Sequence, residues 1–286
     1  MKPLYTKIIL SSIGLVLVYV LFLLPKVVVN DKPVSTKEVN RTEDDPTIPE
    51  EHLAISVEQQ QIIDSYKQKL DKATNSNLFA IFADSLSLVF YDLQQFDSAV
   101  AYKELIYNKI PSQQHKKAYA NMLFEATENY PPGKGIVFAK RAKPLYAELS
   151  NDYPEVETFK VKHAVLIVKT NAAEGIPPIE GINILKEVIS NNPSNILANR
   201  HLGEFYMEIG TSDPKMLTKA TIYFENILKI DPQNIRALIN LLETSIAMEK
   251  KEKARHYHLQ LTELINKEDK FLTDYLSKKN AEINNL

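Results

Sequence analysis

Apolar residues follow two patterns along the 286-residue chain, and a polar stretch separates them. Residues 8–24 (IILSSIGLVLVYVLFLL) form a continuous run without charge. Residues 30–55 are polar and acidic and contain several prolines. From residue 56 onward, apolar residues recur three and four apart, which is typical of amphipathic helices. The pattern predicts an apolar N-terminal segment, a linker and an all-helical region.

The apolar run is suited to a single membrane crossing. As a helix, residues 8–24 span about 26 Å, slightly less than the bilayer core of about 30 Å. Lys7 and Lys26 flank the run and can reach the headgroups. A cleaved signal peptide is the alternative, but no small-residue cleavage site follows Leu24. We therefore expect residues 1–29 to form an uncleaved transmembrane anchor and residues 30–55 a disordered acidic linker.

The orientation of this anchor follows less directly from the charges. Basic residues flank the run on both sides, so their number does not favour a cytoplasmic N-terminus. The short basic head resembles a signal-anchor, however, and large domains translocate largely regardless of charge. We expect a single-pass protein of the inner (plasma) membrane with a periplasmic C-terminal domain. A cytoplasmic C-terminal domain is the alternative.

A short motif recurs through the helical region. In residues 219–234 (KATIYFENILKIDPQN), Ala220 is followed by Phe224, Ile227 and Pro232. The small residue lets two helices approach closely, the aromatic ring fills the space between them, and the proline ends the helix. The same spacing recurs four times, in Ala99, Lys103, Ile106 and Pro111; Ala142, Tyr146, Leu149 and Pro154; Gly181, Leu185, Val188 and Pro193; and Ala254, His258, Leu261 and Asn266.

The best copy also has a matching first helix, with Leu202, Gly203 and Tyr206. This arrangement resembles the tetratricopeptide repeat (TPR), whose signature is Leu-Gly-x-x-Tyr, then Ala-x-x-x-Phe, then a closing proline. The other copies are degenerate, and the chain lacks the tryptophan that often opens the motif. The resemblance implies an all-α fold, a right-handed α-solenoid of helix pairs preceded by one transmembrane helix.

The resemblance covers residues 80–268. It divides them into five repeats, at 80–113, 114–156, 157–195, 196–234 and 235–268. Residues 56–79 and 269–286 are expected to supply capping helices for the two ends of the array. The three central repeats are longer than the others, with extra residues between their two helices. These insertions form either a functional rim or neutral loops.

Composition and motifs exclude several classes of function. The absence of cysteine rules out disulfides, thiolate metal sites and cysteine nucleophiles. A net charge of −2 gives no electrostatic reason to expect nucleic acid. No zinc-protease, nucleophile-elbow or phosphate-loop motif is present, and isolated histidines such as His201 are better explained as satisfied or solvated side chains than as ligands. We expect no enzyme activity, cofactor, metal or small-molecule substrate.

In TPR arrays the first helices of the repeats line a groove for partners. The resemblance implies that this groove is lined by Asp84, Leu88, Tyr91, Met122, Val161, Val165, Arg200, Glu204, Met207, Ile239 and Glu243. The apolar members fit the core between repeats equally well. The Lys, Asn and Arg set of family members that clamp a terminal carboxylate is not seen at the matching places.

Three charged positions in this set share one expected face. Arg200 and Glu204 lie four apart on one helix, and Glu243 lies one repeat further on. They form either a strip that sets the register of a bound segment or an exposed pair of little consequence.

The topology resembles bacterial inner-membrane proteins with one anchor and a periplasmic TPR domain. It predicts a membrane-tethered scaffold or adaptor that binds protein or peptide segments during envelope assembly or secretion. A periplasmic chaperone-like holdase for exported polypeptides is the alternative.

Overall fold

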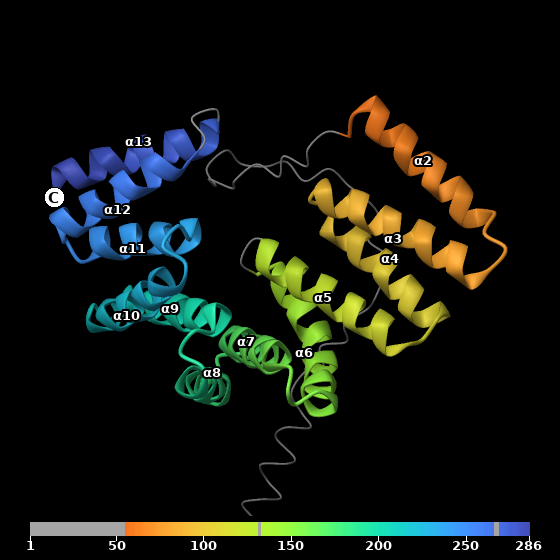
Figure 1. The fold of residues 1–286 in the computed structure, drawn as a ribbon, viewed down its shortest axis with the longest axis horizontal. Coiled ribbons are helices and arrows are strands. Elements are labelled where there is room, and N and C mark those ends of the chain that lie inside the picture. Colours follow the sequence, from red (N-terminus) through yellow and green to blue (C-terminus); the bar gives the residue numbers. More distant parts are fainter. Residues whose placement is uncertain (1–54, 131–132, 266–268) are drawn as a thin grey trace, which may run out of the picture. The chain divides into compact units, whose positions relative to one another are not determined.

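The computed structural model describes residues 55–130, 133–265 and 269–286. These residues belong to one compact unit. Within them the regular elements are all α-helices, twelve in number, and they follow one another along the chain (Figure 1). The all-α fold is therefore confirmed for this part of the chain.

The helices form consecutive pairs. Each one packs against the next in sequence, and the first helices of successive pairs also touch at α7, α9 and α11. The pairs are α3 (Ser76–Asp92) with α4 (Phe96–Lys109), α5 (Gln113–Asn129) with α6 (Gly135–Asp152), α7 (Glu157–Ala173) with α8 (Ile179–Asn191), α9 (Ile196–Gly210) with α10 (Lys215–Ile230), and α11 (Ile235–Ala247) with α12 (Lys251–Leu264); α2 (Val57–Asp71) precedes them and α13 (Lys270–Asn285) follows.

Two of the pairs begin with the same turn chemistry. The side-chain oxygen of Asn195 accepts a hydrogen bond from the backbone N–H of Ala198, and Asn234 accepts one from Ala237. Each asparagine therefore satisfies an N–H group that the helix itself leaves unpaired. A proline two residues earlier, Pro193 or Pro232, ends the preceding helix. This local chemistry explains why α9 and α11 begin where they do.

The extra residues of the central repeats extend helices as well as loops. The connections inside the three central pairs are residues 130–134, 174–178 and 211–214, against 93–95 and 248–250 in the outer pairs. Helices α6 and α7 are 18 and 17 residues long. Part of the inserted sequence thus continues the helical hydrogen-bond ladder, and the expected rim is thinner than the sequence alone indicates.

The repeated motif places a glycine against an aromatic ring. Ala220 and Phe224 are completely buried between α9 and α10. A Cβ atom on Gly203 would lie 2.5 Å from the nearest ring atom of Phe224, far inside van der Waals contact. The two helices can approach this closely only because residue 203 has no side chain.

Two degenerate copies replace the aromatic ring with polar contacts. Lys103 pairs with the carboxylate of Asp84 on the preceding helix. The Nε2 atom of His258 lies 2.9 Å from the carbonyl oxygen of Leu276 on α13. Both side chains remain at the interface between helices, but they join them through hydrogen bonds and charge.

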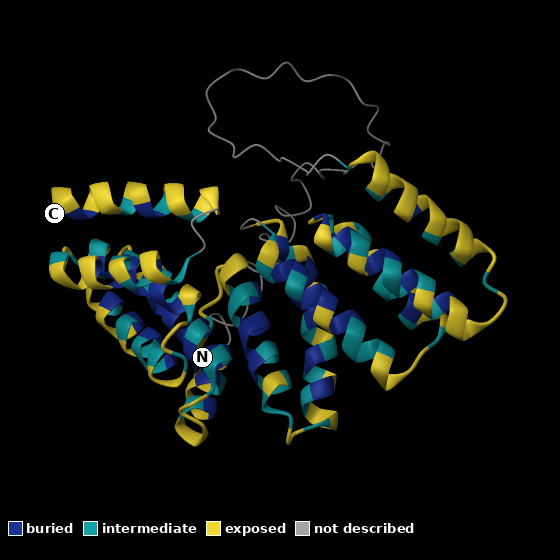
Figure 2. Ribbon diagram, turned by 45° about the horizontal axis from the view of Figure 1, so that its top comes forward, coloured by how far each residue is buried: buried dark blue, intermediate teal, exposed yellow. Residues whose placement is uncertain are grey.

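The first and last described helices have the surface expected of caps. Ile63 is the buried residue of α2, and Leu276 and Ile283 are those of α13. Most of the remaining surface of both helices is exposed (Figure 2). The limits of the five repeats and of the two caps stay predictions, because helix ends alone do not define a repeat.

The predicted anchor, residues 1–29, lies outside the described residues, and so does nearly all of the linker, residues 30–55. Among the helices of residues 55–286 that the structure describes, none combines the length and apolar character needed to cross a bilayer.

We expect the contact between Gly203 and Phe224 to be measurable as a coupling. In the parent chain, Gly203→Ala should destabilise the fold by about 1–3 kcal/mol, because its methyl group overlaps the ring. In the Phe224→Leu background the same change should cost clearly less, because the overlapping ring atoms are gone. Thermal unfolding of the four variants measures this; costs that simply add would show that the two residues do not touch.

Candidate partner-binding surface

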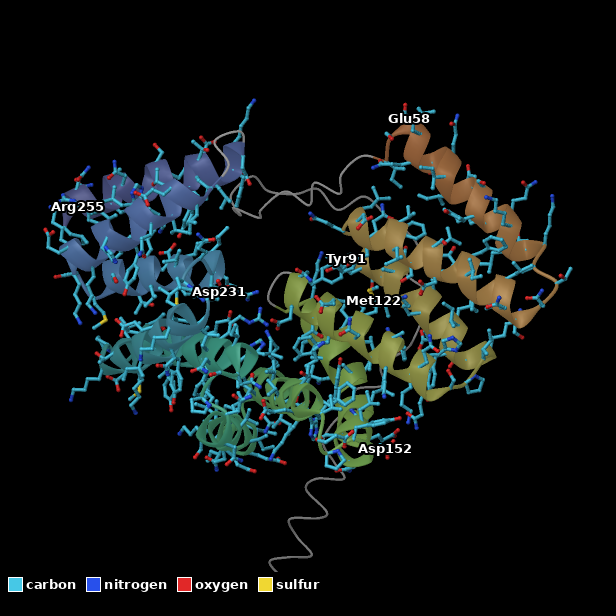
Figure 3. The ribbon with its side chains drawn as sticks, viewed as in Figure 1. Glu58, Tyr91, Met122, Asp152, Asp231 and Arg255 are labelled. Carbon is cyan, nitrogen blue, oxygen red and sulfur yellow. The ribbon has the colours of Figure 1, made fainter. Side chains whose placement is uncertain are left out.

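The predicted groove residues fall into two groups according to exposure. Met122, Val161 and Val165 are buried, with exposed fractions of 7%, 0% and 2%. They belong to the apolar core between helices, which the sequence left open as their alternative role. Leu88 is 51% exposed, and Tyr91, Met207 and Ile239 are partly exposed. Tyr91 on α3 and Met122 on α5 are labelled in Figure 3.

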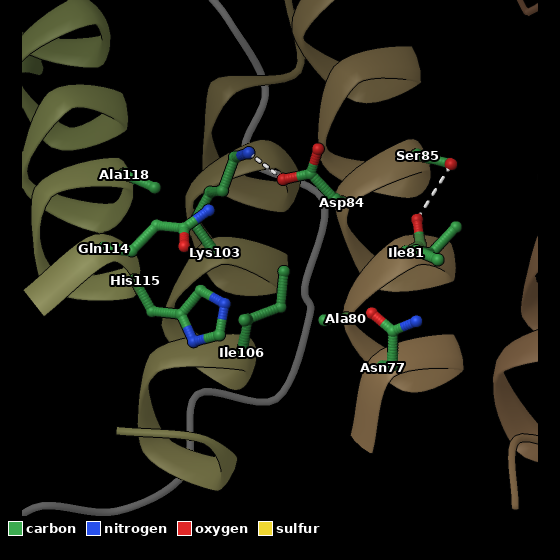
Figure 4. Close-up of a pocket in the computed structure, with 10 residues that line it drawn as sticks. All are labelled: Asn77, Ala80, Ile81, Asp84, Ser85, Lys103, Ile106, Gln114, His115 and Ala118. Carbon is green, nitrogen blue, oxygen red and sulfur yellow. Dashed lines mark hydrogen bonds and ion pairs between the residues drawn. The ribbon is translucent and has the colours of Figure 1, made fainter. Parts of the chain in front are cut away.

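A cavity of about 450 Å³ opens between α3, α4 and α5 (Figure 4). Ile81 and Ile106 contribute apolar surface to it. The ion pair between Asp84 and Lys103 lies on its wall, and both charges are already neutralised by each other. Gln114 lies on the α5 side. The cavity therefore offers apolar surface bordered by groups that form hydrogen bonds.

A second cavity, of about 370 Å³, lies between α9, α10 and α11. Its apolar lining includes Leu197 and Ile227, and its polar lining includes Arg200, Arg236 and Asn240. The Nδ2 atom of Asn240 is buried and has no hydrogen-bond partner among the described residues. Because an unpaired buried donor is costly, this atom is an available hydrogen-bond donor beside the cavity.

The two cavities occupy the same place in different helix pairs. In the repeat alignment, Ile81 corresponds to Leu197, Asp84 to Arg200 and Ile106 to Ile227. Each cavity lies between the first and second helices of one pair and the first helix of the next. The surface thus repeats a site of similar shape with different charges.

A buried group of charged side chains connects α5, α7 and α9 and reaches the second cavity through Arg200. Glu128 near the end of α5 lies 3.3 Å from Arg200 Nη2 and 3.1 Å from Lys169 Nζ on α7. Its side chain is only 8% exposed. His201, 5% exposed, lies beside Arg200 on α9, and its ring packs edge-on against Phe124 of α5 at 6.3 Å between centroids. Side chains of α5 and α9 therefore touch although α6, α7 and α8 come between these helices in sequence.

The network continues toward α11. Glu204 Oε2 lies 3.2 Å from His201 Nδ1, and Glu204 Oε1 lies 2.8 Å from Arg236 Nη2. We call Glu128, Lys169, Arg200, His201, Glu204 and Arg236 the charge cluster. It joins four first helices, α5, α7, α9 and α11, through paired charges.

The surroundings keep both carboxylates of the charge cluster ionised. Burial alone would raise the pKa of Glu128, but His201, Lys169 and Arg200 together bring it below its ordinary value. Burial would likewise raise the pKa of Glu204, but the hydrogen bond with His201 and the charges of His201, Arg236 and Arg200 lower it to about 2. Both carboxylates therefore stabilise the fold above pH 4.5, and this stabilisation is lost as pH falls through their lowered pKa values.

Arg200 and Glu204 lie on the same helix, as the sequence predicts, but in the structure their ion-pair partners are Glu128 and Arg236 rather than each other. The alternative of an exposed pair of little consequence does not fit, because Arg200 and Glu204 are partly buried and each pairs with another helix; a role of the strip in binding stays a prediction. Glu243 is not part of the cluster, because it binds Lys279 of α13 at 3.0 Å. Glu128 was missed entirely, since its pairing with Arg200 joins residues 72 positions apart and no local pattern reports such a contact.

Glu128, His201 and Glu204 also bring three possible metal-binding atoms within 4.8 Å of one another. Arg200, however, lies 2.9 Å from His201 Nε2, and Lys169 and Arg236 each hold one of the carboxylates. A divalent cation would face three positive charges at this position. The geometry therefore favours an internally neutralised cluster over a metal site.

Removing the Glu128 charge should destabilise the fold more than removing an exposed one. Glu128→Gln leaves the cations of Lys169 and Arg200 without their partner in a buried setting, which we expect to cost about 1–3 kcal/mol at pH 7.5.

Glu148→Gln provides the control, because it breaks an ion pair with Lys116 between α5 and α6 in which Glu148 is 58% exposed. That change should cost less than about 1 kcal/mol. Chemical unfolding of both variants measures the difference. Equal costs would show that the charge cluster contributes no more than a surface pair.

Comparisons with known proteins bear on the fold. No protein-family model and no curated protein sequence matches this chain. Among solved structures, a thermophilic TPR protein from Thermus thermophilus matches with a TM-score of 0.54 and 15% identity, over 71% of this chain and 99% of that one.

Two further matches have TM-scores below 0.5 and carry no weight here. PilW, described as a type IV pilus biogenesis factor, has a TM-score of 0.47 at 16% identity, over 71% of this chain and 84% of its own. YrrB, described as a TPR protein with an unusual peptide-binding site, has a TM-score of 0.40 at 16% identity, over 76% and 99%. At such identities the Thermus match concerns the fold alone: the described part of this chain has a TPR-like all-α fold.

Proposed function

We propose that the protein is a membrane-tethered scaffold or adaptor that binds segments of other proteins on the face formed by its first helices. The observation that carries this proposal is the pair of equivalent cavities, one between α3, α4 and α5 and the other between α9, α10 and α11. Each combines an apolar lining with polar side chains at its border. Such surfaces suit extended or amphipathic segments, whose apolar side chains enter pockets while polar groups fix their register.

The different charges of the two cavities give the bound segment a direction. Asp84 and Lys103 neutralise each other at the first cavity. Arg200 and Arg236 line the second, where each also pairs with a carboxylate of the charge cluster and the free donor of Asn240 adds hydrogen-bonding capacity. A partner with an uncharged apolar side chain at one end and an acidic side chain at the other matches both cavities.

The tether in this proposal is residues 8–24. It rests on the length of the uncharged run and on the absence of a cleavage site after it. We place the C-terminal domain in the periplasm of a bacterial envelope, where the partner belongs to envelope assembly or secretion. A cytoplasmic C-terminal domain is the alternative, and a reporter fused to the C-terminus distinguishes the two.

A holdase for exported polypeptides is the second candidate. The exposed apolar side chains of Ile81 and Leu88 on α3 favour it, because scattered apolar contacts suit weak binding of many clients. Crosslinking in native membranes followed by purification separates the two functions. A scaffold yields one partner in fixed stoichiometry, and a holdase yields a broad set. Neither function requires a cofactor or a catalytic group.

Deleting residues 1–29 should release the protein from membranes, because the rest of the sequence contains no other long apolar run. Fractionation after a high-salt wash measures this. A truncated protein that still sediments with membranes would reveal a second attachment and contradict the tether.

Ile81→Glu should reduce recovery of the crosslinked partner at least about tenfold, equivalent to about 1.4 kcal/mol, because it places a charge in the apolar part of the first cavity. Ile222→Glu is the matched control. Ile222 is exposed to a similar extent, 53% against 48%, but lies on the second helix α10 and lines neither cavity. Equal recovery with both variants would move the binding surface away from this cavity.

A further inference from the structure

The contacts of His201 fix which of its ring nitrogens carries the proton. Nε2 lies 2.9 Å from Arg200 Nη2, and Nδ1 lies 3.2 Å from Glu204 Oε2. A guanidinium group can only donate hydrogen bonds, so Nε2 accepts the bond from Arg200. The proton then resides on Nδ1 and is donated to Glu204. The neutral ring is thus held in one tautomer, with hydrogen bonds on both sides.

The groups around this ring come from several helices, and most of them are charged. From α8, the uncharged Leu185 lines the same small cavity as His201. The charged groups that surround His201 and Arg200 are Glu125 and Glu128 from α5, Lys162 and Lys169 from α7, Glu204 and Glu208 from α9, and Arg236 from α11.

A second proton on the ring reverses the contact with Arg200. Protonated Nε2 is a donor and carries positive charge, so it faces a like-charged donor at 2.9 Å. Glu128 Oε2 lies 3.7 Å from Nε2, and a movement of about 1 Å brings this acceptor to hydrogen-bond distance. This is the same oxygen that Arg200 contacts at 3.3 Å. His201 and Arg200 therefore compete for one carboxylate oxygen once His201 is charged.

We propose that His201 is a proton-controlled switch, in which protonation exchanges its partner Arg200 for Glu128 and releases the Arg200 guanidinium toward the cavity between α9, α10 and α11. Glu128 remains neutralised after the exchange, because Lys169 holds its other oxygen. The released guanidinium already lines that cavity and needs no change of helix position to face it.

In the proposed function, the switch makes binding at the second cavity depend on pH. Only this biological use rests on the proposed function. With Arg200 free, the second cavity holds two unengaged groups, the guanidinium and the Asn240 amide, beside Arg236. Acidic side chains of a partner are then bound more tightly at low pH. The exchange itself takes place inside the chain and requires no partner.

The pH range follows from burial. Burial lowers the pKa of His201 below its ordinary value of 6.5, so the ring is neutral at pH 7.5 and takes up its proton only in acid. As pH decreases, His201 takes up its proton in the unfolded chain before it does so in the folded one. Its contribution to the free energy of unfolding therefore falls below pH 6.5 and stops falling once the folded ring is also protonated. His201→Gln keeps one donor and one acceptor but cannot titrate, and it should remove this loss.

A double-mutant cycle tests the exchange. The parent, Glu128→Gln, His201→Gln and the double variant are unfolded chemically at pH 7.5 and at an acid pH where the nitrogen NMR spectrum shows His201 to be charged, with the full-length chain in detergent micelles. The coupling between the two positions, expressed as a ratio of unfolding constants, should favour the folded state roughly tenfold more at the acid pH, since only charged His201 attracts Glu128. The Lys116→Gln and Glu148→Gln cycle should show no such change. A coupling that stays constant or weakens in acid would overturn the switch.

Nitrogen NMR of the histidine rings tests the same exchange without relying on variant stability. The signals of His201, one of six histidines, are identified by their loss in His201→Gln. We expect the Nδ1–H form at pH 7.5 and, on acidification, the charged ring while the helicity by circular dichroism is still unchanged. An Nε2–H form at pH 7.5, or a ring that stays neutral until the helices unfold, contradicts the proposal. Neither measurement involves a partner, so failure here leaves the proposed scaffold function untouched.

Discussion

The pairing of Glu128 with Arg200 connects two helices that are far apart in sequence, and the arrangement of the central pairs depends on it. A helical-repeat array is stabilised mostly by contacts between neighbours, so each pair adjusts to the next. A contact from α5 to α9 adds a constraint across a whole intervening pair. Because Glu128 is buried, its ionised form is tolerated only while the cations around it stay in place. The charge cluster thus makes the position of α9 relative to α5 a condition of stability.

This constraint also shapes the surface offered to partners. A TPR-like array without such a contact presents one continuous groove along its first helices. Here the charge cluster joins α5 to α9, and two of its members, Arg200 and Arg236, also line the second cavity. In the proposed function, a partner segment meets two separate cavities with different polar groups. The spacing between them is set by α5, α7 and α9, which the cluster holds together.

The sequence predicts the features that depend on short-range spacing. The all-α fold and the consecutive helix pairs follow from residues such as Ala220 and Phe224, whose contacts lie within one pair. Prolines mark helix ends at Pro193 and Pro232, although Pro144 lies inside α6 and shows that the rule is not general. The location of Arg200 and Glu204 on a first helix was also predictable from the repeat.

What the sequence could not supply is the partner of each charged residue. Arg200 and Glu204 satisfy the four-residue spacing of an intrahelical pair, yet Arg200 binds Glu128 and Glu204 binds Arg236. Such choices depend on how far the array curves between non-adjacent pairs, and periodicity carries no information about that. For the same reason, the repeat alignment placed Val161 and Leu88 on first helices but could not predict that Val161 is buried and Leu88 exposed.

The distance between α5 and α9 tests this account most directly. The chain has no cysteine, so spin labels can be attached through Gln113→Cys on α5 and Ile209→Cys on α9, both at exposed positions. Pulsed electron spin resonance then gives the distance distribution in the parent and in Glu128→Gln. We expect one narrow distribution in the parent and a broader or longer one once the carboxylate is neutralised. An identical narrow distribution in both would show that the charge cluster does not hold the two helices together.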